Sequence, residues 1–283
     1  MEHTLSRRSF LSASAALAGA ASPLLAAGKK PVLGLELYSV RNELAKDLPG
    51  TLKAVAKMGY EGVEVFGPYA DWKLDYAKEV RKMLDDLNLK ALSAHTGAKY
   101  FTPDELARVA ELNLALGSKY IVMSSAGRVT SLDGWKEVGA KLTAADAQLK
   151  KLKLRTGFHN HATEFTPLEG KRPIEVLAAT TPKSVVLQLD VGTCLQAGSD
   201  PIEWTKANPG RIVSIHLKDW KNAPGHEGYR ILLGEGYGKF KELIQTAGKT
   251  GGLEYVLVEQ EGHELPALEA SEKCLQNLKK ILG

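Results

Sequence analysis

Short apolar runs alternate with longer amphipathic segments along almost the whole chain. Eight of the short runs are rich in Val, Ile, Leu and aromatic residues and have the length of β-strands; they cover residues 32–38, 62–66, 90–95, 120–124, 155–159, 185–190, 212–217 and 255–259. Between them, apolar residues recur at a spacing of about 3.6, which predicts helices such as 48–58, 76–87, 103–116 and 135–152. Pro103 with two acids behind it favours a helix start, and Gly59 and Gly117 stand where C-caps belong.

Strands that alternate with helices predict a parallel sheet with right-handed crossovers. Eight such strands favour a closed (β/α)8 TIM barrel over an open doubly wound sheet. After the first predicted strand, the sequence Tyr38-Ser39-Val40-Arg41 also lacks the glycine-rich fingerprint of a dinucleotide-binding fold. No linker or low-complexity tract interrupts residues 29–283, so we predict a single α/β domain whose length matches the ~250 residues typical of one barrel.

Residues 1–28 follow a different pattern. Arg7 and Arg8 precede an uncharged, Ala-rich stretch over residues 11–27, which ends in small residues before Lys29. A segment this short is typical of a cleaved twin-arginine (Tat) signal and not of a membrane anchor. We therefore expect the Tat machinery as a partner, a periplasmic location and no stable membrane anchor. An exported chain can form a disulfide, but the positions of Cys194 and Cys274, near the strand ends and on the last helix, predict two free thiols.

Four successive predicted strands end on a residue that can bind a hard or borderline metal ion. These residues are His159, Asp190, His216 and Glu259. A single polar strand end is ordinary, but four in succession indicate one shared site, because all parallel strands of a barrel end at the same face. Imidazole and carboxylate ligands suit Mn²⁺, Zn²⁺, Co²⁺ or Mg²⁺. Lys218 lies two residues after His216, so strand alternation directs it to the same face.

The order of several short motifs resembles the xylose isomerase-like TIM barrels, the superfamily of sugar phosphate isomerases and epimerases. The resemblance covers essentially all of residues 29–283 and rests on GLELYSVR (34–41), GVE (62–64), FHNH (158–161), LD (189–190), HLKD (216–219), GEG (234–236) and VE (258–259). It implies the barrel fold and one divalent metal ion held by Glu, Asp, His and Glu from strands five to eight. It identifies the superfamily well and the substrate poorly.

The strand-five position departs from that pattern. Asp190, His216 and Glu259 match the implied ligands in type, but His159 stands where relatives have Glu. An imidazole in place of a carboxylate makes the ligand set one charge less negative, which favours Zn²⁺, Mn²⁺ or Co²⁺ over Mg²⁺. His161 and Glu164, which follow closely, are the alternative ligands from this strand.

The resemblance implies a metal-dependent sugar isomerase or epimerase. Such an enzyme removes a proton beside a carbonyl, and the metal stabilises the resulting enediolate. Glu259 would serve as ligand and base, and Glu164 would be the second proton-handling group. Lys218 would bind substrate or polarise the enediolate; the alternative is an ion pair with Asp219 or another strand-end acid.

Further polar and aromatic residues are candidates for contact with a small carbohydrate. His95 and Glu64 are expected near the same face, each with a structural role as the alternative. His161 is a further candidate for substrate contact, and Trp220 is a candidate stacking platform. Export points to a non-phosphorylated sugar, because sugar phosphates are mainly cytoplasmic. The resemblance also allows a homo-oligomer, since dimers and tetramers are common in the superfamily.

Three other functions compete with the isomerase. A lyase or hydratase would use the same enediolate to eliminate a group from a 3-keto sugar or glycoside, and a non-catalytic protein would only bind the sugar. An AP endonuclease would need more histidines: Thr193 stands where those relatives have His. The net charge of +4 without a basic cluster gives no support for a nucleic-acid partner.

Overall fold

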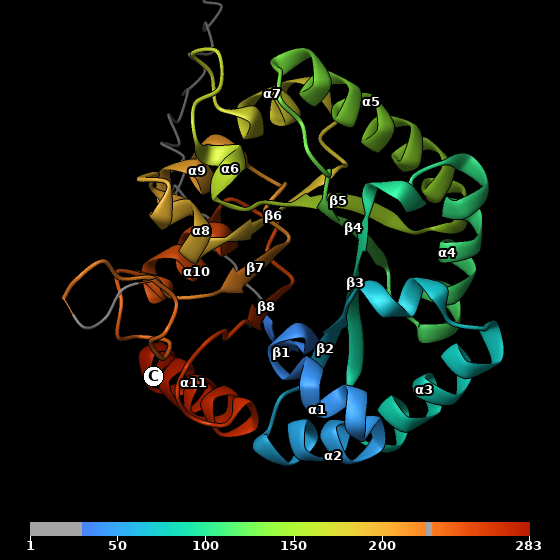
Figure 1. Ribbon diagram of the computed structural model, residues 1–283, viewed down its shortest axis with the longest axis vertical. Helices are drawn as coiled ribbons and strands as arrows, with labels where there is room; N and C mark the ends of the chain where they lie inside the picture. Colours follow the sequence, from blue (N-terminus) through green and yellow to red (C-terminus); the bar gives the residue numbers. More distant parts are fainter. Residues whose placement is uncertain (1–29, 225–227) are drawn as a thin grey trace, which may run out of the picture.

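The computed structural model describes residues 30–224 and 228–283, and the predicted leader therefore lies outside the described residues. All eight predicted strands are present and close into one barrel in sequence order, with every neighbouring pair parallel (Figure 1). The strands are β1 (Val32–Glu36), β2 (Gly62–Val65), β3 (Lys90–Gly97), β4 (Tyr120–Ser125), β5 (Arg155–His159), β6 (Val186–Asp190), β7 (Ser214–Leu217) and β8 (Tyr255–Val258). The predicted single-domain TIM barrel is confirmed.

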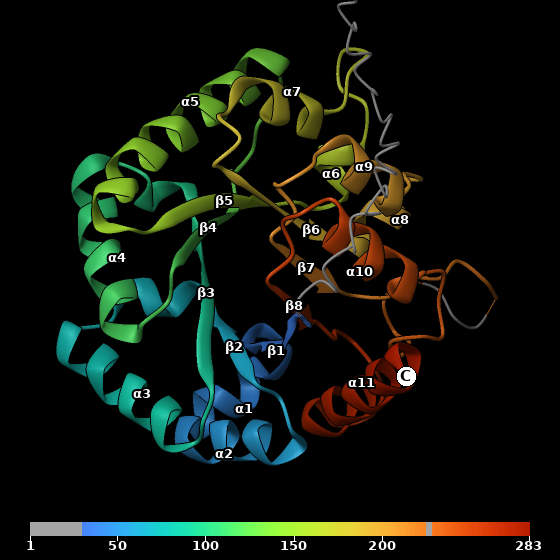
Figure 2. The same cartoon turned by 180° about the vertical axis from the view of Figure 1, so that it is seen from behind.

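Helices surround the barrel, as the views from its two sides show (Figures 1 and 2). The elements between and after the strands are η1 (Leu37–Val40), α1 (Arg41–Lys46), α2 (Leu48–Met58), η2 (Gly67–Asp71), α3 (Leu74–Asp86), η3 (Ala98–Tyr100), α4 (Pro103–Leu116), α5 (Leu132–Leu149), η4 (Lys150–Leu152), α6 (Ala162–Phe165), α7 (Pro173–Thr180), α8 (Val191–Gln196), α9 (Pro201–Ala207), α10 (Phe240–Lys249) and α11 (Ala267–Leu282). The short helices α6 and α8 directly follow strands and so lie next to the strand ends.

Local capping chemistry explains where the helices begin and end. Helix α4 starts at Pro103 and stops at Gly117, whose φ of 75° is the left-handed value that glycine adopts without strain. Gly59 ends α2 in the same way, with φ 94°. Helix α5 begins earlier than the apolar spacing indicated, because the Ser131 hydroxyl accepts a hydrogen bond from the Gly134 amide at 3.1 Å.

Several buried ionisable side chains lie at the strand ends. Apolar side chains fill the layer between strands and helices, whereas Glu36, Glu64, His159, Asp190 and His216 are 0–3 % exposed at or near the carboxyl ends of their strands. Burying such groups is unfavourable unless they are paired or bind an ion. Packing alone therefore does not explain the buried ionisable side chains at this face.

Two smaller expectations concern the cysteines and the membrane. Within the described ranges, Cys194 and Cys274 are buried free thiols, as predicted. In the part of the chain that the structure describes, no helix is both long and apolar enough to cross a bilayer.

Candidate metal centre

Four buried side chains meet at the carboxyl-terminal face of the barrel. His159 is the last residue of β5 and Asp190 is the last residue of β6. His216 lies within β7, and Glu259 directly follows β8. Each offers a ligand atom, and these atoms all lie within 4.8 Å of one another. The structure thus brings together the four residues predicted as metal ligands; their binding of a metal stays a prediction.

Asp190 supplies the clearest sign of a missing partner. One carboxylate oxygen, Oδ1, accepts a hydrogen bond from the Thr193 amide at 2.8 Å. The other, Oδ2, is buried without a hydrogen-bond partner among the described residues; His159 Nε2 lies 3.9 Å away and Lys218 Nζ 4.0 Å away. An unpaired buried carboxylate oxygen costs about 1–3 kcal/mol or more, so this atom fits a cation ligand.

The two ligand residues on β5 and β6 have the protonation that a metal requires. Burial, reinforced by the nearby His216 and His95 rings, holds the pKa of His159 well below its usual range, so the ring is neutral and has a free nitrogen lone pair. Burial and the charge of Glu259 raise the pKa of Asp190 to about 6, although Lys218 opposes the shift. Asp190 is therefore mostly ionised at neutral pH.

His216 lies between two carboxylates. Its Nδ1 is 2.6 Å from Glu259 Oε2 and its Nε2 is 2.7 Å from Glu64 Oε1. Burial alone would lower the pKa of His216, but the two carboxylates outweigh burial and raise it to about 10. Without a metal, His216 is an imidazolium whose charge offsets part of the negative charge of its neighbours.

Lys218 forms the cationic side of the site. Its ammonium contacts Glu259 Oε1 at 2.9 Å and also Glu261, and it lies 4.7 Å from the centre of the Tyr229 ring. Burial opposes its charge, but Glu259, Asp190 and Glu261 together raise the pKa of Lys218 above its ordinary value. The predicted alternative of a strand-end ion pair is thus present, although Asp219 is not the partner.

Asp219 instead organises the following loop. Its carboxylate accepts hydrogen bonds from the Gly234, Gly236 and Gly238 amides at 2.9, 2.9 and 3.0 Å. A Cβ at position 236 would come within 2.2 Å of Asp219, so this amide can reach the carboxylate because residue 236 is glycine. The Gly-Glu-Gly motif noted in the sequence therefore shapes the backbone.

A cavity of about 430 Å³ opens above the four clustered residues. Its lining combines acids, imidazoles, one amine and two aromatic rings: Glu36, Tyr38, Phe66, Gly67, His95, Ser124, His159, His161, Lys218, Glu259 and Glu261. Of the residues predicted to act on substrate, His95, His161, Lys218 and Glu259 therefore reach the cavity. Polar groups around an open cavity of this size suit a small polar ligand.

Other predicted site residues lie outside the lining. Glu164 Oε2 accepts the His161 backbone amide at 2.6 Å and caps α6, and burial raises the pKa of Glu164 to about 7. Trp220 packs edge-on against Tyr237, with ring centres 5.7 Å apart. Glu64 lies beneath the cavity and is fully buried. These positions favour structural roles for Glu164 and Trp220.

Gln188 is a polar residue of this region that sequence reasoning missed. It is 1 % exposed and contacts His95, His159 and Glu64 by hydrogen bonds. The signal was available, because Gln188 precedes Asp190 by two residues and strand alternation directs both to the same side. Glu261 was likewise overlooked, although it contacts Lys218 at the cavity wall.

Known proteins resemble the chain in sequence. Residues 52–281 match the family described as xylose isomerase-like TIM barrel. The rhizopine catabolism protein MocC of Rhizobium meliloti is 24 % identical over 255 residues, which cover 77 % of each chain. The inosose dehydratase of Clostridium perfringens is 27 % identical over 188 residues, covering 59 % of this chain and 62 % of that protein.

Solved structures resemble it in fold. A sugar phosphate isomerase/epimerase from Parabacteroides distasonis has a TM-score of 0.75 and 26 % identity over 90 % of this chain and 95 % of its own. The zinc-containing IOLI protein has a TM-score of 0.67 and 19 % identity, over 89 % and 98 % respectively. Since the matched residues include β2 to β8 of a closed barrel, the chain belongs to the xylose isomerase-like TIM barrel family.

Proposed function

We propose that the protein is a divalent-metal-dependent sugar isomerase or epimerase that acts through an enediolate on a non-phosphorylated sugar. One observation carries the proposal: two imidazoles and two carboxylates converge beneath a polar cavity, and one of their oxygens is buried without a partner among the described residues. A family that includes proteins named as isomerases, epimerases and dehydratases of sugar-like compounds supports it.

His159, Asp190, His216 and Glu259 would hold the metal. Two nitrogen and two oxygen donors at a buried site suit Zn²⁺, and also Mn²⁺ or Co²⁺, better than Mg²⁺, which prefers oxygen ligands and water. The zinc atom in the IOLI structure agrees with this choice. When bound, such an ion would supply Lewis-acid stabilisation of negative charge that develops on substrate oxygens.

The chain's own side chains would handle orientation and protons. Lys218 is held by Glu259 and Glu261 at the cavity wall, where its ammonium can donate a hydrogen bond to an oxygen that becomes negative during enolisation. Glu259 is kept ionised, because Lys218 and His216 outweigh burial and hold the pKa of Glu259 well below its usual range. It can thus accept a proton in its resting state.

A second proton-handling group must come from the cavity wall. His161 takes this role in place of Glu164, because His161 lines the cavity whereas Glu164 caps a helix. Burial lowers the pKa of His161, so its ring is neutral at pH 7 and can accept and return a proton. The hydrogen bond from the His161 amide to the Glu164 carboxylate fixes the backbone of His161.

A lyase or dehydratase is the second candidate. The similarity to an inosose dehydratase favours it, and loss of water from an enediolate requires only that a positioned acid protonate the leaving hydroxyl. Product mass distinguishes the two reactions, since isomerisation conserves mass and dehydration removes one water. A non-catalytic sugar-binding protein would bind the sugar without retaining a metal.

Export is part of the same proposal. Arg7 and Arg8 before an uncharged Ala-rich stretch support Tat-dependent transfer to the periplasm after folding, with the metal already bound. A periplasmic enzyme would meet free or glycosidic sugars more often than sugar phosphates.

Metal analysis combined with a sugar panel tests the proposal. Protein exported from its native host is assayed for metal by mass spectrometry and then incubated with free, oxidised and glycosidic sugars, with products read by mass. Asp190→Ala and Glu259→Ala should lose the metal, whereas Asp146→Ala, which removes a buried carboxylate on α5, should retain it. Retention of metal by the first two variants would show that the proposed centre is wrong.

A further inference from the structure

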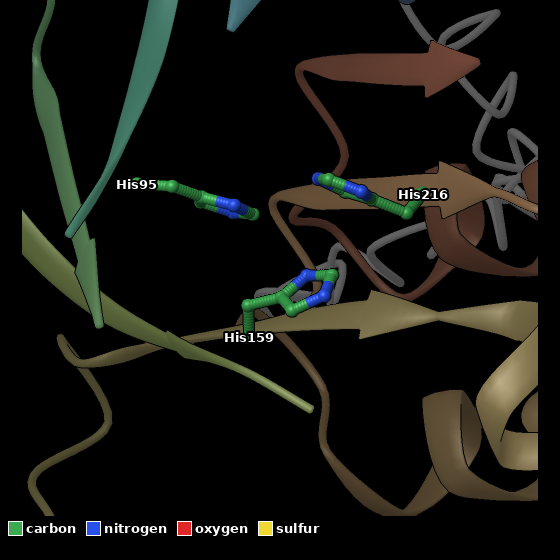
Figure 3. A group of neighbouring side chains, drawn as sticks. All are labelled: His95, His159 and His216. Atoms are coloured by element: carbon green, nitrogen blue, oxygen red, sulfur yellow. The ribbon is translucent and has the colours of Figure 1, made fainter. Parts of the chain in front are cut away.

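A second layer of polar side chains lies directly beneath the proposed metal centre. Glu64 on β2 and Gln188 on β6 are 0 and 1 % exposed, and together they contact three buried imidazoles. Figure 3 shows these rings, His95, His159 and His216, gathered from β3, β5 and β7; the His95 and His216 rings are parallel with centres 5.1 Å apart. The layer therefore determines how each ring is turned.

The side-chain amide of Gln188 has one orientation that satisfies its neighbours. Its Nε2 donates to Glu64 Oε2 at 2.8 Å, so its Oε1 faces the opposite way. There Oε1 lies 2.5 Å from His95 Nε2 and 3.1 Å from His159 Nδ1. An amide oxygen can only accept hydrogen bonds, so both of these ring nitrogens must carry a hydrogen.

The tautomer of His159 follows from this contact. A neutral ring with its hydrogen on Nδ1 has its lone pair on Nε2. That nitrogen lies 3.9 Å from Asp190 Oδ2, the buried oxygen with no hydrogen-bond partner among the described residues. The lone pairs on His159 Nε2 and Asp190 Oδ2 are therefore both unshared and lie close together, as two ligands of one cation must.

Glu64 acts on His216 in the same manner. Glu64 Oε1 lies 2.7 Å from His216 Nε2, and Nδ1 of the same ring faces Glu259 Oε2 at 2.6 Å. Because this carboxylate holds the hydrogen on Nε2, Nδ1 beside Glu259 is the nitrogen that would lose its proton when a metal binds. Glu64 is itself held by Gln188 and by the Ser93 hydroxyl, so its carboxylate cannot turn away.

We propose that Gln188 and Glu64 are positioning residues: Gln188 fixes the tautomer of His159, and Glu64 keeps the hydrogen on Nε2 of His216, so that Nε2 of the first ring and Nδ1 of the second would be the metal ligands. The inference rests on the proposed metal centre. It also assigns the group of His95, His159 and His216 to this hydrogen-bonded layer instead of to a second ion, because Glu64 and Gln188 oxygens already accept from nitrogens of all three rings. One metal ion per chain is the expected stoichiometry.

A double-mutant cycle on zinc affinity tests the role of Gln188. Gln188→Met keeps the side-chain length and removes both hydrogen-bonding groups, and zinc dissociation constants are measured by chelator competition. The loss of such an outer contact typically weakens metal binding roughly 10–100-fold, and we expect this for Gln188→Met. In a His159→Ala background the same change should have a smaller effect, because only the contacts of Gln188 with Glu64 and His95 are then lost. Asn113→Leu, which removes a buried amide on α4, is the matched control and should bind zinc normally.

A spectroscopic measurement reports the tautomer itself. Long-range proton–nitrogen NMR of histidine-labelled protein should show the hydrogen of His159 on Nδ1, and Gln188→Met should give a mixture of both tautomers; the His159→Ala spectrum assigns the signal. A His159 ring protonated on Nε2, normal zinc affinity of Gln188→Met, or two zinc ions per chain would overturn the inference while leaving the metal centre in place. Wild-type protein that binds no divalent metal would overturn both.

Discussion

Replacing Asp190 by asparagine should stabilise the protein without metal and abolish its stabilisation by metal. Asparagine has nearly the same shape, and its amide oxygen can still accept the Thr193 backbone hydrogen bond that Asp190 Oδ1 receives at 2.8 Å. The change removes the negative charge from a carboxylate whose second oxygen is buried and unpaired within the described part of the chain. A residue kept for metal binding should carry such an energetic penalty when the metal is absent.

The magnitude follows from the shift in protonation. Burial raises the pKa of Asp190 from 3.8 to about 6, and each unit corresponds to about 1.4 kcal/mol, so ionisation at pH 7 costs the folded protein about 3 kcal/mol. Because the folded value is the higher one, the penalty is absent below pH 3.8, grows as the pH rises and is complete above pH 6. Metal binding opposes it: free zinc at 100 times its dissociation constant adds about 2.7 kcal/mol.

Urea unfolding of wild type and Asp190→Asn, with chelator or with zinc, measures both effects. At pH 7 the chelated variant should be more stable than the chelated wild type by up to about 3 kcal/mol, the difference should shrink towards pH 4, and zinc should stabilise only the wild type. Asp146→Asn is the control: Oδ2 of Asp146 on α5 is paired with Lys150 and Ser184, away from the proposed ligands, and the variant should keep its response to zinc. A chelated Asp190→Asn protein less stable than wild type at every pH would refute the reasoning.

Three further predictions address catalysis, protons and export. Lys218→Met should retain the metal in elemental analysis but reduce kcat by roughly 10²–10³, since its ammonium is assigned to charge on the substrate; unchanged turnover would contradict that role. The logarithm of zinc affinity should rise by about one per pH unit between pH 7 and 9, because metal binding must remove a proton from His216, whose pKa is raised to about 10. The slope should steepen below the pKa of Asp190 near 6, and competition titrations across both pH ranges measure these slopes. Changing Arg7 and Arg8 to lysine should leave uncleaved protein in the cytoplasm, and periplasmic appearance at the normal level in cell fractionation would argue against Tat export.

The convergence of the proposed ligands could be predicted because it depends on two simple rules. Polar residues at the ends of apolar runs mark the carboxyl ends of strands, and a barrel gathers those ends at one face. The rules therefore predicted, without any knowledge of loop structure, that four side chains converge. Their ligand atoms lie within 4.8 Å of one another in the structure: His159, Asp190, His216 and Glu259. The rules fail beyond the strands, because loop backbones decide where later residues point.

Glu164 illustrates that limit. A glutamate three residues after the start of a helix commonly returns to cap the helix, and Glu164 does so by accepting the His161 amide. The spacing contained this signal, but the absence of a glutamate at the strand end drew attention to Glu164 as a replacement. Gln188 shows the opposite case. The direction of its side chain followed from strand alternation, but its hydrogen bonds depend on three partners from β2, β3 and β5 that only the closed barrel brings together.

The charges beneath the cavity explain why an imidazole suits position 159. Burial and the neighbouring Glu64 raise the pKa of Glu36, so that carboxyl is neutral. Without metal, the buried carboxylates of Glu64, Asp190 and Glu259 then face the Lys218 ammonium and the His216 imidazolium, which leaves these buried groups with one net negative charge. Glu261, which also contacts Lys218, is partly exposed to solvent and is not one of these buried groups. A divalent ion that displaces the His216 proton brings this sum to zero. A carboxylate at position 159 would leave the occupied site one charge negative, and burying that charge would be unfavourable unless a further cation entered with it.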